Sequence, residues 1–366
     1  MIHKKGKKLR SGFTTGTAAA AATKGALMLL LEGRAPDHVT IRLLTGNTIQ
    51  IPVHFCLQID DRTAQCSVIK DAGDDPDITH NAEIGARVRF SDQTGTKPVT
   101  VTGGQGVGKV TKPGLSISPG EPAITRGPRK MISEAIQGVL ENHRLRGSVS
   151  IEVFVPKGEN LARKTLNARL GILGGISILG TTGVVRPISH EAYIATIDAA
   201  LSVAKASGLD NVVLTTGRRG ERFSQRWWKE LPEEAFIQIG DFFKISLTKV
   251  SKKGFRKASI TVFFGKAVKM AQGIPHTHAA KSNLSMERLS KWALELTGNK
   301  RLATRIGGAN TARHALDFIL PEFPEVVFRV GEEMVAWART FAGSSVGIRG
   351  IIYGFEGDKI FDSEGT

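Results

Sequence analysis

The stretch Gly171–Ser189, with the sequence GILGGISILGTTGVVRPIS, is the feature that most limits how this chain can fold. It holds five glycines and no acidic residue, and its single charge is Arg186. A run this apolar is typical of a buried strand or helix, yet glycine weakens both elements. Two interpretations remain open. The glycines either let the backbone approach a large flat ligand, or let the chain cross tightly between two domains.

A change of pattern near residue 188 predicts two domains, because single hydrophobic cores rarely extend over 366 residues. Before it, β-rich runs outnumber the helices expected at 18–31 and 128–142, which indicates an α+β domain over residues 1–188. After it, β-rich runs that begin near residues 211, 236 and 259 alternate with helical segments. This order predicts an α/β domain over residues 189–366, Rossmann-like and with a mostly parallel sheet.

Local signals place the ends of some helices. Thr17 is the expected N-cap of the first helix, and Gly33 is expected to end it. The pair Trp227 and Trp228 lies in a predicted helix and is interpreted as core packing.

The excess of basic residues predicts an acidic partner. Lys and Arg number 50 against 34 for Asp and Glu, which gives a net charge of +16 and a pI near 10.0. Nucleic acid, an anionic membrane surface or a small molecule with many carboxylates would each suit this charge. The basic residues are dispersed and aromatic residues make up 6% of the chain, so base stacking is poorly provided for. Nucleic-acid binding is kept as the alternative function.

Two cysteines, Cys56 and Cys66, lack the spacing of a metal site and are expected to be reduced thiols in the core. Reduced cysteines are typical of cytoplasmic proteins. The basic start and the apolar run that follows it lack the order of a signal peptide, and no run is long enough to span a membrane. We therefore expect a cytoplasmic protein without a membrane partner. Whether it forms a homo-oligomer stays open.

Three segments near the start of the chain carry binding signals. Phe13–Thr17 offers hydroxyls and free amide groups at the positive end of a helix, which predicts an anion site. Asp71–His80, DAGDDPDITH, holds four aspartates and a histidine, and it is either a set of local turns or a ligand site. Gly103–Val110, GGQGVGKV, nearly matches a phosphate-binding loop, but Val110 replaces the Ser or Thr that binds magnesium. An anion-contacting loop and an ordinary turn remain alternatives there.

In the second half, Leu214–Gly220 ends a predicted strand and opens a helix. Ligands of parallel sheets bind outside the carboxyl ends of the strands, and an acid about 20 residues further on suits a ribose hydroxyl. Thr216, Gly217 and Asp241 are therefore predicted to bind a nucleotide-like cofactor. His276 and His278 have no further ligand at recognisable spacing, so no metal site is predicted.

Seven segments occur along the chain in a characteristic order: FTTGTAAAAATKG, KDAGDDPDITH, GGQGVGKVTKPGL, LGILGGISILGTTGVVRPIS, TTGRRGE, QIGDF and GKAVKMAQG. Together they resemble the CbiD family, in which these segments are expected in this order, from about residue 9 to residue 280. The chain departs from that family at Asn81, which follows the acidic motif where the family usually has glycine.

The resemblance implies a cobalt-precorrin-5B C1-methyltransferase of anaerobic cobalamin biosynthesis. Such an enzyme moves a methyl group from S-adenosylmethionine to a cobalt-containing tetrapyrrole and gives cobalt-precorrin-6A. Cobalt arrives inside this substrate, so a protein metal site is not required. The substrate is a flat macrocycle fringed with carboxylates, which agrees with the basic charge of the chain.

The resemblance also implies roles for individual residues. Thr216, Gly217 and Asp241 are assigned to S-adenosylmethionine. Asp71, His80 and His278 are candidates for acid–base catalysis. The residues assigned to the macrocycle are Thr14, Thr15, Lys70, Asp74, Gly175, Thr181, Thr182 and Arg186.

Overall fold

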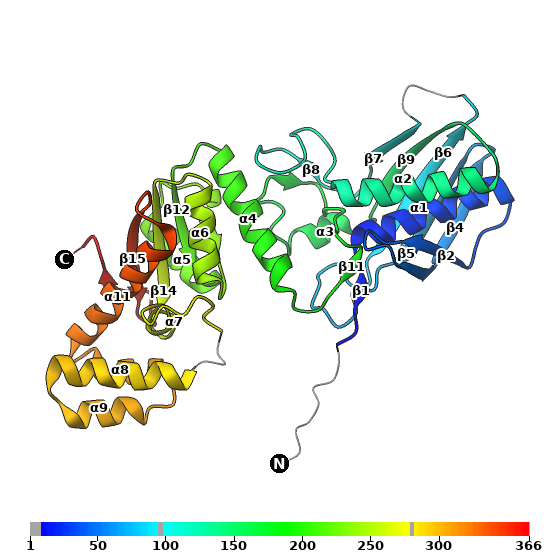
Figure 1. Ribbon diagram of the computed structural model, residues 1–366. Coiled ribbons are helices and arrows are strands. Elements are labelled where there is room, and N and C mark those ends of the chain that lie inside the picture. The colour runs from blue at the N-terminus through cyan, green and yellow to red at the C-terminus, as the bar shows by residue number, and fades with distance from the viewer. Residues whose placement is uncertain (1–8, 94–97, 279–281, 366) are drawn as a thin grey trace, which may run out of the picture. The chain divides into compact units, whose positions relative to one another are not determined.

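The computed structural model describes residues 9–93, 98–278 and 282–365, with the backbone alone at 282–285 (Figure 1). The chain divides into two compact units, Met1–Ser189 and His190–Thr366, here called unit 1 and unit 2. Each unit contains a five-stranded sheet, so the chain has a mixed α/β architecture with two sheet-containing units.

Unit 1 is built on a sheet with the strand order β4-β5-β6-β9-β7, in which only the β7–β9 pair is parallel. A separate hairpin joins β2 and β3. The elements of unit 1 are β1 (Gly12–Phe13), α1 (Thr15–Glu32), β2 (His38–Arg42), β3 (Thr48–Pro52), β4 (Phe55–Asp60), β5 (Thr63–Ile69), β6 (Glu83–Ser91), β7 (Val99–Gly103), β8 (Lys109–Val110), α2 (Arg126–Asn142), β9 (Ser148–Phe154), α3 (Gly158–Ala162), β10 (Ile172–Leu173) and β11 (Val184–Val185).

Helix α1 forms the centre of the core of unit 1, and α2 lies beside it (Figure 1). Ala18–Ala22 are completely buried, because their small side chains let the helix lie close to both the sheet and α2. The helix ends at Gly33, which adopts the left-handed conformation with φ 68°, as the sequence predicted. Its N-cap is Thr14 and not Thr17, so that expectation was wrong.

The glycine-rich stretch Gly171–Ser189 crosses unit 1 as a strap, a name used below for these residues. It forms two short strands, β10 paired with β8 and β11 paired with β1. Isolated bridges join Ile176 to Val107 and Ile178 to Ile124. The strap is therefore held by backbone hydrogen bonds to two distant segments of the unit, residues 12–16 and 106–125.

The two cysteines form a disulfide between neighbouring strands of the five-stranded sheet in unit 1, so the expectation of reduced thiols was wrong. Cys56 on β4 and Cys66 on β5 are direct partners in the antiparallel register, with their Cα atoms 4.1 Å apart. This closeness comes from the strand register, which the ten-residue separation in sequence does not reveal.

Unit 2 has a sheet with the strand order β13-β12-β14-β15-β16, and only the edge strand β16 is antiparallel. The expected runs near residues 211, 236 and 259 are β12, β13 and β14, three of its four parallel strands, and β15 is the fourth. The elements are α4 (His190–Ala206), β12 (Asn211–Thr215), α5 (Arg218–Trp227), the 3₁₀ helix η1 (Glu233–Ala235), β13 (Phe236–Gln238), α6 (Phe243–Lys252), β14 (Lys257–Phe263), α7 (Phe264–Met270), α8 (Ser282–Thr297), α9 (Lys300–Gly307), α10 (Ala312–Ile319), α11 (Pro324–Ala342), β15 (Gly347–Tyr353) and β16 (Lys359–Asp362).

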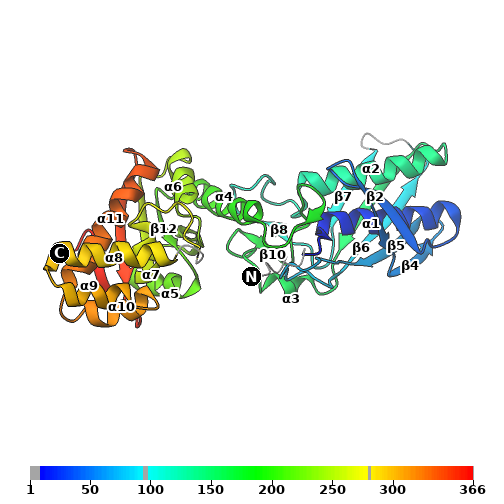
Figure 2. The same cartoon turned by 60° about the horizontal axis from the view of Figure 1, so that its bottom comes forward.

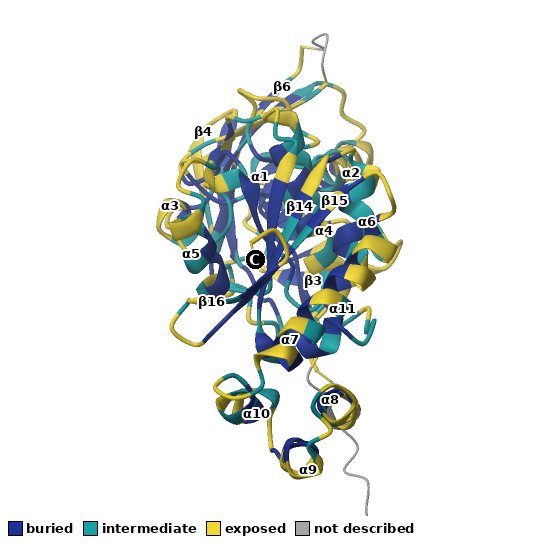
Figure 3. Ribbon diagram, turned by 90° about the vertical axis from the view of Figure 1, so that its left-hand side faces the viewer, coloured by how far each residue is buried: buried dark blue, intermediate teal, exposed yellow. Residues whose placement is uncertain are grey.

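Helix α5 contacts β12, β13 and β14, while α6 packs against both α4 and α11. The short helices α9 and α10 lie near α7 and α8, and each has an exposed and a buried side (Figures 2 and 3). Trp227 at the end of α5 is 52% exposed and is covered by Lys359, whose ammonium lies 4.1 Å from the ring centre. The expectation of core packing was therefore wrong for Trp227. Among the described residues, no helix combines the length and apolar character needed to cross a membrane.

Candidate functional site

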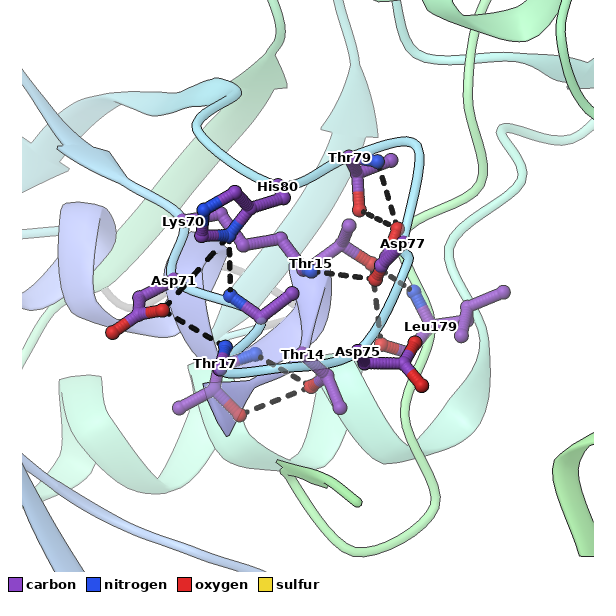
Figure 4. A network of polar contacts seen from close by, with 12 residues as sticks. Thr14, Thr15, Thr17, Lys70, Asp71, Asp75, Asp77, Thr79, His80 and Leu179 are labelled. Carbon is purple, nitrogen blue, oxygen red and sulfur yellow. Dashed lines mark hydrogen bonds and ion pairs between the residues drawn. The ribbon is translucent and has the colours of Figure 1, made fainter. Parts of the chain in front are cut away.

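The predicted site residues gather in two places, one within each unit. In unit 1, the loop that carries the acidic motif wraps around the start of α1 (Figure 4). In unit 2, the predicted cofactor residues lie where strands β12 and β13 end.

Lys70 and Asp77 form an ion pair inside the acidic loop, with Nζ 2.7 Å from Oδ2 (Figure 4). The side chain of Lys70 is 1% exposed and that of Asp77 is 25% exposed. Burial alone would raise the pKa of Asp77, but the hydrogen bond and charge of Lys70 outweigh it and lower that pKa. Thr79 adds two hydrogen bonds of 2.7 Å, from its amide and its hydroxyl, to Oδ1. The carboxylate of Asp77 is thus held ionised as part of the loop.

Asp71 accepts a forked pair of bonds from the guanidinium of Arg10, one of them 2.9 Å long. This hydrogen bonding from Arg10 is the main reason that the pKa of Asp71 lies below its usual value, although burial opposes the shift. His80 lies beside it, with Nδ1 3.9 Å from the nearer carboxylate oxygen of Asp71. Since Nδ1 accepts the amide of Ala72 at 3.1 Å, the neutral ring carries its proton on Nε2. Both predicted acid–base candidates keep more than a third of their side-chain surface exposed.

The other two aspartates of the motif bind backbone amides. Asp74 accepts the amide of Arg10 at 2.6 Å, and Asp75 accepts that of Ile188 at 2.9 Å. The loop therefore ties the first residues of the unit to its last ones. Asn81 has a φ of 60°, which explains why glycine suits this position in the family that the motifs resemble.

Threonine hydroxyls at the start of α1 anchor the strap. Thr15 Oγ1 accepts the amide of Leu179 at 2.9 Å, and Thr17 Oγ1 donates to the carbonyl of Gly183 at 2.7 Å. Thr14 Oγ1 caps the helix by accepting the amide of Thr17 at 3.2 Å. The three predicted binding hydroxyls thus have partners within unit 1, and Thr14 and Thr15 are buried. Their role toward a substrate stays a prediction.

Gly175 is buried where the strap crosses the loop GGQGVGKV. A side chain at this position would overlap the carbonyl group of Gly106, and a side chain at Gly158 would overlap the same group. This crossing accounts for the glycine-rich loop and for Gly175 through close backbone packing. Thr181, Thr182 and Arg186 of the strap, in contrast, are exposed to solvent. The assignment of these residues to a substrate stays a prediction.

In unit 2, Thr216 and Gly217 join the end of β12 to the start of α5. No side chain caps α5, so the amide groups of its first turn can donate hydrogen bonds to a ligand. The hydroxyl of Thr215 beneath it is completely buried and has no hydrogen-bond partner among the described residues. The next strand along the chain, β13, lies on one side of β12, whereas β14 lies on the other. Such a reversal of strand order is where parallel sheets bind ligands.

Asp241 follows β13 and is held by Lys266 and Thr277. Thr277 Oγ1 donates to Asp241 Oδ1 at 3.0 Å, and the Lys266 ammonium binds the same oxygen. Burial opposes ionisation of Asp241, but these two partners outweigh it and lower its pKa. Within the described part of the chain, no hydrogen bond reaches Oδ2, so this oxygen can accept one from a ligand. Sequence reasoning missed Lys266, which follows the glycine after β14.

His278 is exposed, and its carbonyl oxygen accepts a hydrogen bond from Lys269 at 3.3 Å. Its ring lies 6.2 Å from that of His276, which also packs against His190 at 5.0 Å. Burial lowers the pKa of His276, and the neighbouring imidazoles add to this effect against the charge of Asp241. In the described ranges, no group of three potential ligands is placed to hold a metal ion.

A pocket of about 440 Å³ lies at the ends of β14 and β15, beside the start of α5. Its walls include Arg219 and Arg313, neither of which sequence reasoning selected. The tandem arginines of TTGRRGE were the available signal for Arg219, whereas nothing in the local sequence around Arg313 indicates the pocket.

Comparison with known proteins shows two family models that match this chain. One described as CbiD covers residues 2–187, and one described as CbiD, C-terminal domain, covers residues 276–364. A Priestia megaterium protein named cobalt-precorrin-5B C(1)-methyltransferase is 45% identical over 318 residues, which cover 87% of this chain and 86% of that protein. A Salinispora arenicola protein of the same name is 41% identical over 361 residues, covering 98% and 93% of the two chains. A crystal structure of a cobalamin biosynthesis protein (cbiD) from Archaeoglobus fulgidus matches at 26% identity with a TM-score of 0.38, over 70% of this chain and 78% of that one.

Proposed function

Because this chain belongs to the CbiD family, we propose that it transfers a methyl group from S-adenosylmethionine to C1 of cobalt-precorrin-5B, which gives cobalt-precorrin-6A. The family predicted from the motifs is confirmed. The chain is a methyltransferase of cobalamin biosynthesis that acts on a cobalt-precorrin, because its relatives at 41% and 45% identity are named cobalt-precorrin-5B C(1)-methyltransferase. The identity of the methyl donor and the position of its binding site are what we propose here.

We place the nucleoside of the donor at the carboxyl edge of the sheet in unit 2. The observation that carries this placement is Asp241, which is ionised, partly buried and has one carboxylate oxygen available to a ligand. An ionised carboxylate at this edge can accept a hydroxyl of a ribose through that free oxygen. Thr216 and Gly217 lie on the adjacent strand end, where the uncapped start of α5 offers amide groups.

Catalysis of this methyl transfer requires the protein mainly to position the donor methyl group and the ring carbon. S-adenosylmethionine supplies a methyl group already activated by its sulfonium charge. The residues of the chain must hold the donor and the ring carbon in line, exclude water between them and accept a released proton. Asp71, His80 and His278 are exposed enough to contact a substrate, and they remain the candidates for that proton.

The substrate is a polycarboxylate, and the chain carries a net charge of +16. Among the residues assigned to the macrocycle, Arg186 is an exposed cation on the strap, and Thr181 and Thr182 are exposed beside it. Lys70 and Asp74 have partners inside unit 1, so they support the shape of the acidic loop whether or not they touch the substrate. The predicted cytoplasmic location stays a prediction.

Isothermal titration calorimetry with S-adenosylmethionine and S-adenosylhomocysteine tests the proposal. We expect both to bind, and we expect Asp241→Asn to weaken both by about tenfold, since a hydrogen bond to a charged group contributes roughly 1.5 kcal/mol or more. Absence of binding of either compound, with or without cobalt-precorrin-5B, would contradict the proposed donor. The nucleic-acid alternative receives no support from the comparisons, and a steep fall of nucleic-acid affinity with salt would be needed to revive it.

A further inference from the structure

The pocket at the ends of β14 and β15 lies on the same edge of the sheet as the proposed nucleoside site. Arg219 from α5 and Arg313 from α10 form part of its wall, and Phe263 and Tyr353 from the two strands form another part. None of these residues has a role in the function proposed so far. The pocket measures about 440 Å³, which is within the range of small-molecule sites.

Two guanidinium groups stack on opposite faces of one aromatic ring in this pocket. The central carbon of Arg219 lies 3.9 Å from the centre of the Phe355 ring, and that of Arg313 lies 3.7 Å from it. Arg219 also donates a hydrogen bond to the carbonyl oxygen of Phe355, which fixes its direction. Phe355 is 46% exposed, so the stack borders solvent and a ligand can reach it.

Neither guanidinium forms an ion pair with a carboxylate of the described chain. The two like charges repel each other across the Phe355 ring, and an anion bound at the edge of either guanidinium would relieve this repulsion. A guanidinium binds a carboxylate through two parallel hydrogen bonds, so a carboxylate is the anion that fits Arg313, for which the described residues provide no hydrogen-bond partner. The pocket therefore has a carboxylate-binding end.

The same pocket contains carboxylates of its own. Asp317 on α10 and Glu356 and Asp358 after β15 also form its wall, and none of them is in an ion pair within the described residues. They would repel a ligand that carries only negative charges, such as an acetate or propionate arm. They suit a ligand that adds a positive group, such as an ammonium, close to its carboxylate. The combination of free arginines and free acids selects an α-amino acid group.

We propose that this pocket binds the α-amino acid end of the methyl donor, with Arg313 on its carboxylate, Arg219 adding positive charge from the other face of Phe355, and the acids on its ammonium group. The inference rests on the proposed function, because it assumes that S-adenosylmethionine is the donor. Adjacent strands lie about 4.8 Å apart, so Asp241 after β13 and the pocket between β14 and β15 are separated by roughly 10–14 Å along the edge. An extended adenosyl amino acid spans such a distance. The aromatic wall between the two ends favours the positive sulfonium.

The test compares two ligands that differ only at the proposed end. S-adenosylhomocysteine carries the amino acid group, and 5′-methylthioadenosine lacks it. Calorimetry on the full chain should show that Arg313→Gln weakens S-adenosylhomocysteine by about 10- to 100-fold and that Arg219→Gln, which removes only the more distant charge, weakens it by less. Both variants should leave the affinity for 5′-methylthioadenosine unchanged. Asp317→Asn should show the same selective loss, with a smaller size.

Arg305→Gln is the matched control, because Arg305 on α9 stacks on Phe318 at 4.3 Å outside this pocket. It removes one charge and one stacked guanidinium, and it should change neither affinity. Arginine variants that bind S-adenosylhomocysteine as tightly as the parent chain would overturn the inference while the proposed function stands. A loss confined to the cobalt-precorrin would also overturn it and would assign Arg313 to a carboxylate of that substrate. If the parent chain binds neither nucleoside, the proposed function fails as well.

Discussion

Replacing Gly175 by alanine should destabilise unit 1 strongly, because the strap crosses the 104–108 loop at this residue with no space for a side chain. The new methyl carbon would lie 2.7 Å from the carbonyl carbon of Val107 and would overlap the carbonyl group of Gly106. Real Cβ atoms essentially never come within 3.0 Å of another heavy atom, and backbone groups cannot swing aside. The two segments must therefore separate, which strains the hydrogen bonds from Ile176 N to Gly106 O (3.0 Å) and from Gly108 N to Ile176 O (2.9 Å).

Two weakened hydrogen bonds contribute about 1 kcal/mol each, and overpacking adds about 1–3 kcal/mol, which gives roughly 3–5 kcal/mol in total. For a unit of this size each kcal/mol lowers the melting temperature by about 2–4 °C, so a loss of about 6–20 °C is expected. Differential scanning calorimetry measures this loss. Gly138→Ala on α2 is the matched control, because nothing lies within 4 Å of the new carbon and alanine is the better helix former. A Gly175→Ala protein that melts like the parent but loses affinity for the macrocycle would refute the packing argument and favour a ligand-facing strap.

Further predictions concern the ion pair in the acidic loop and the disulfide. Lys70→Met should cost about 3 kcal/mol in urea unfolding, because it leaves Asp77 partly buried without its cation. The pKa of Asp77 lies below its usual 3.8, so its contribution to stability is complete above about pH 4 and is lost as pH falls through the lowered pKa. Asp77→Asn should therefore flatten the acid side of the stability profile, and an unchanged profile would contradict the pairing. The Cys56–Cys66 disulfide closes a loop of about ten residues, so reduction should cost about 2–3 kcal/mol. Thiol titration of the unreduced, denatured protein should find no free cysteine, and two free thiols would contradict the disulfide.

Much of the secondary structure could be predicted from the sequence. Helices with a clear stop signal were placed well, such as α1 with its end at Gly33 and α4, which ends just before Gly208. The parallel strands of unit 2 followed from their β-rich runs and from the helices between them. Helices α9 and α10 and the edge strand β16 were missed. Elements of four to eight residues contain too few repeats of the hydrophobic pattern for it to be recognised.

The candidate site was less predictable, because its contacts join segments far apart in the chain. The sequence indicated that the threonines and aspartates of the first 80 residues were unusual, but their partners depend on tertiary structure. Thr15 binds the strap 164 residues later, and Asp75 binds the amide of Ile188. The pairing of Arg219 with Arg313 across Phe355 depends on how α10 packs, and no local pattern encodes that.

The structure revised the interpretation of the strap more than that of any other segment. Its glycines suggested either a ligand surface or a tight crossing, and the structure shows the crossing at Gly175 in detail. Exposed Thr181, Thr182 and Arg186 leave one part of the strap available to a substrate.

Methyl transfer itself tests the central claim most directly. The purified chain is incubated with cobalt-precorrin-5B and S-adenosylmethionine that carries a ¹³C-labelled methyl group, and the product is examined by NMR and mass spectrometry. The account predicts one labelled methyl group per macrocycle, attached to ring carbon C1, with one S-adenosylhomocysteine formed for each transfer. A macrocycle that stays unlabelled, or one labelled at another position, would contradict it.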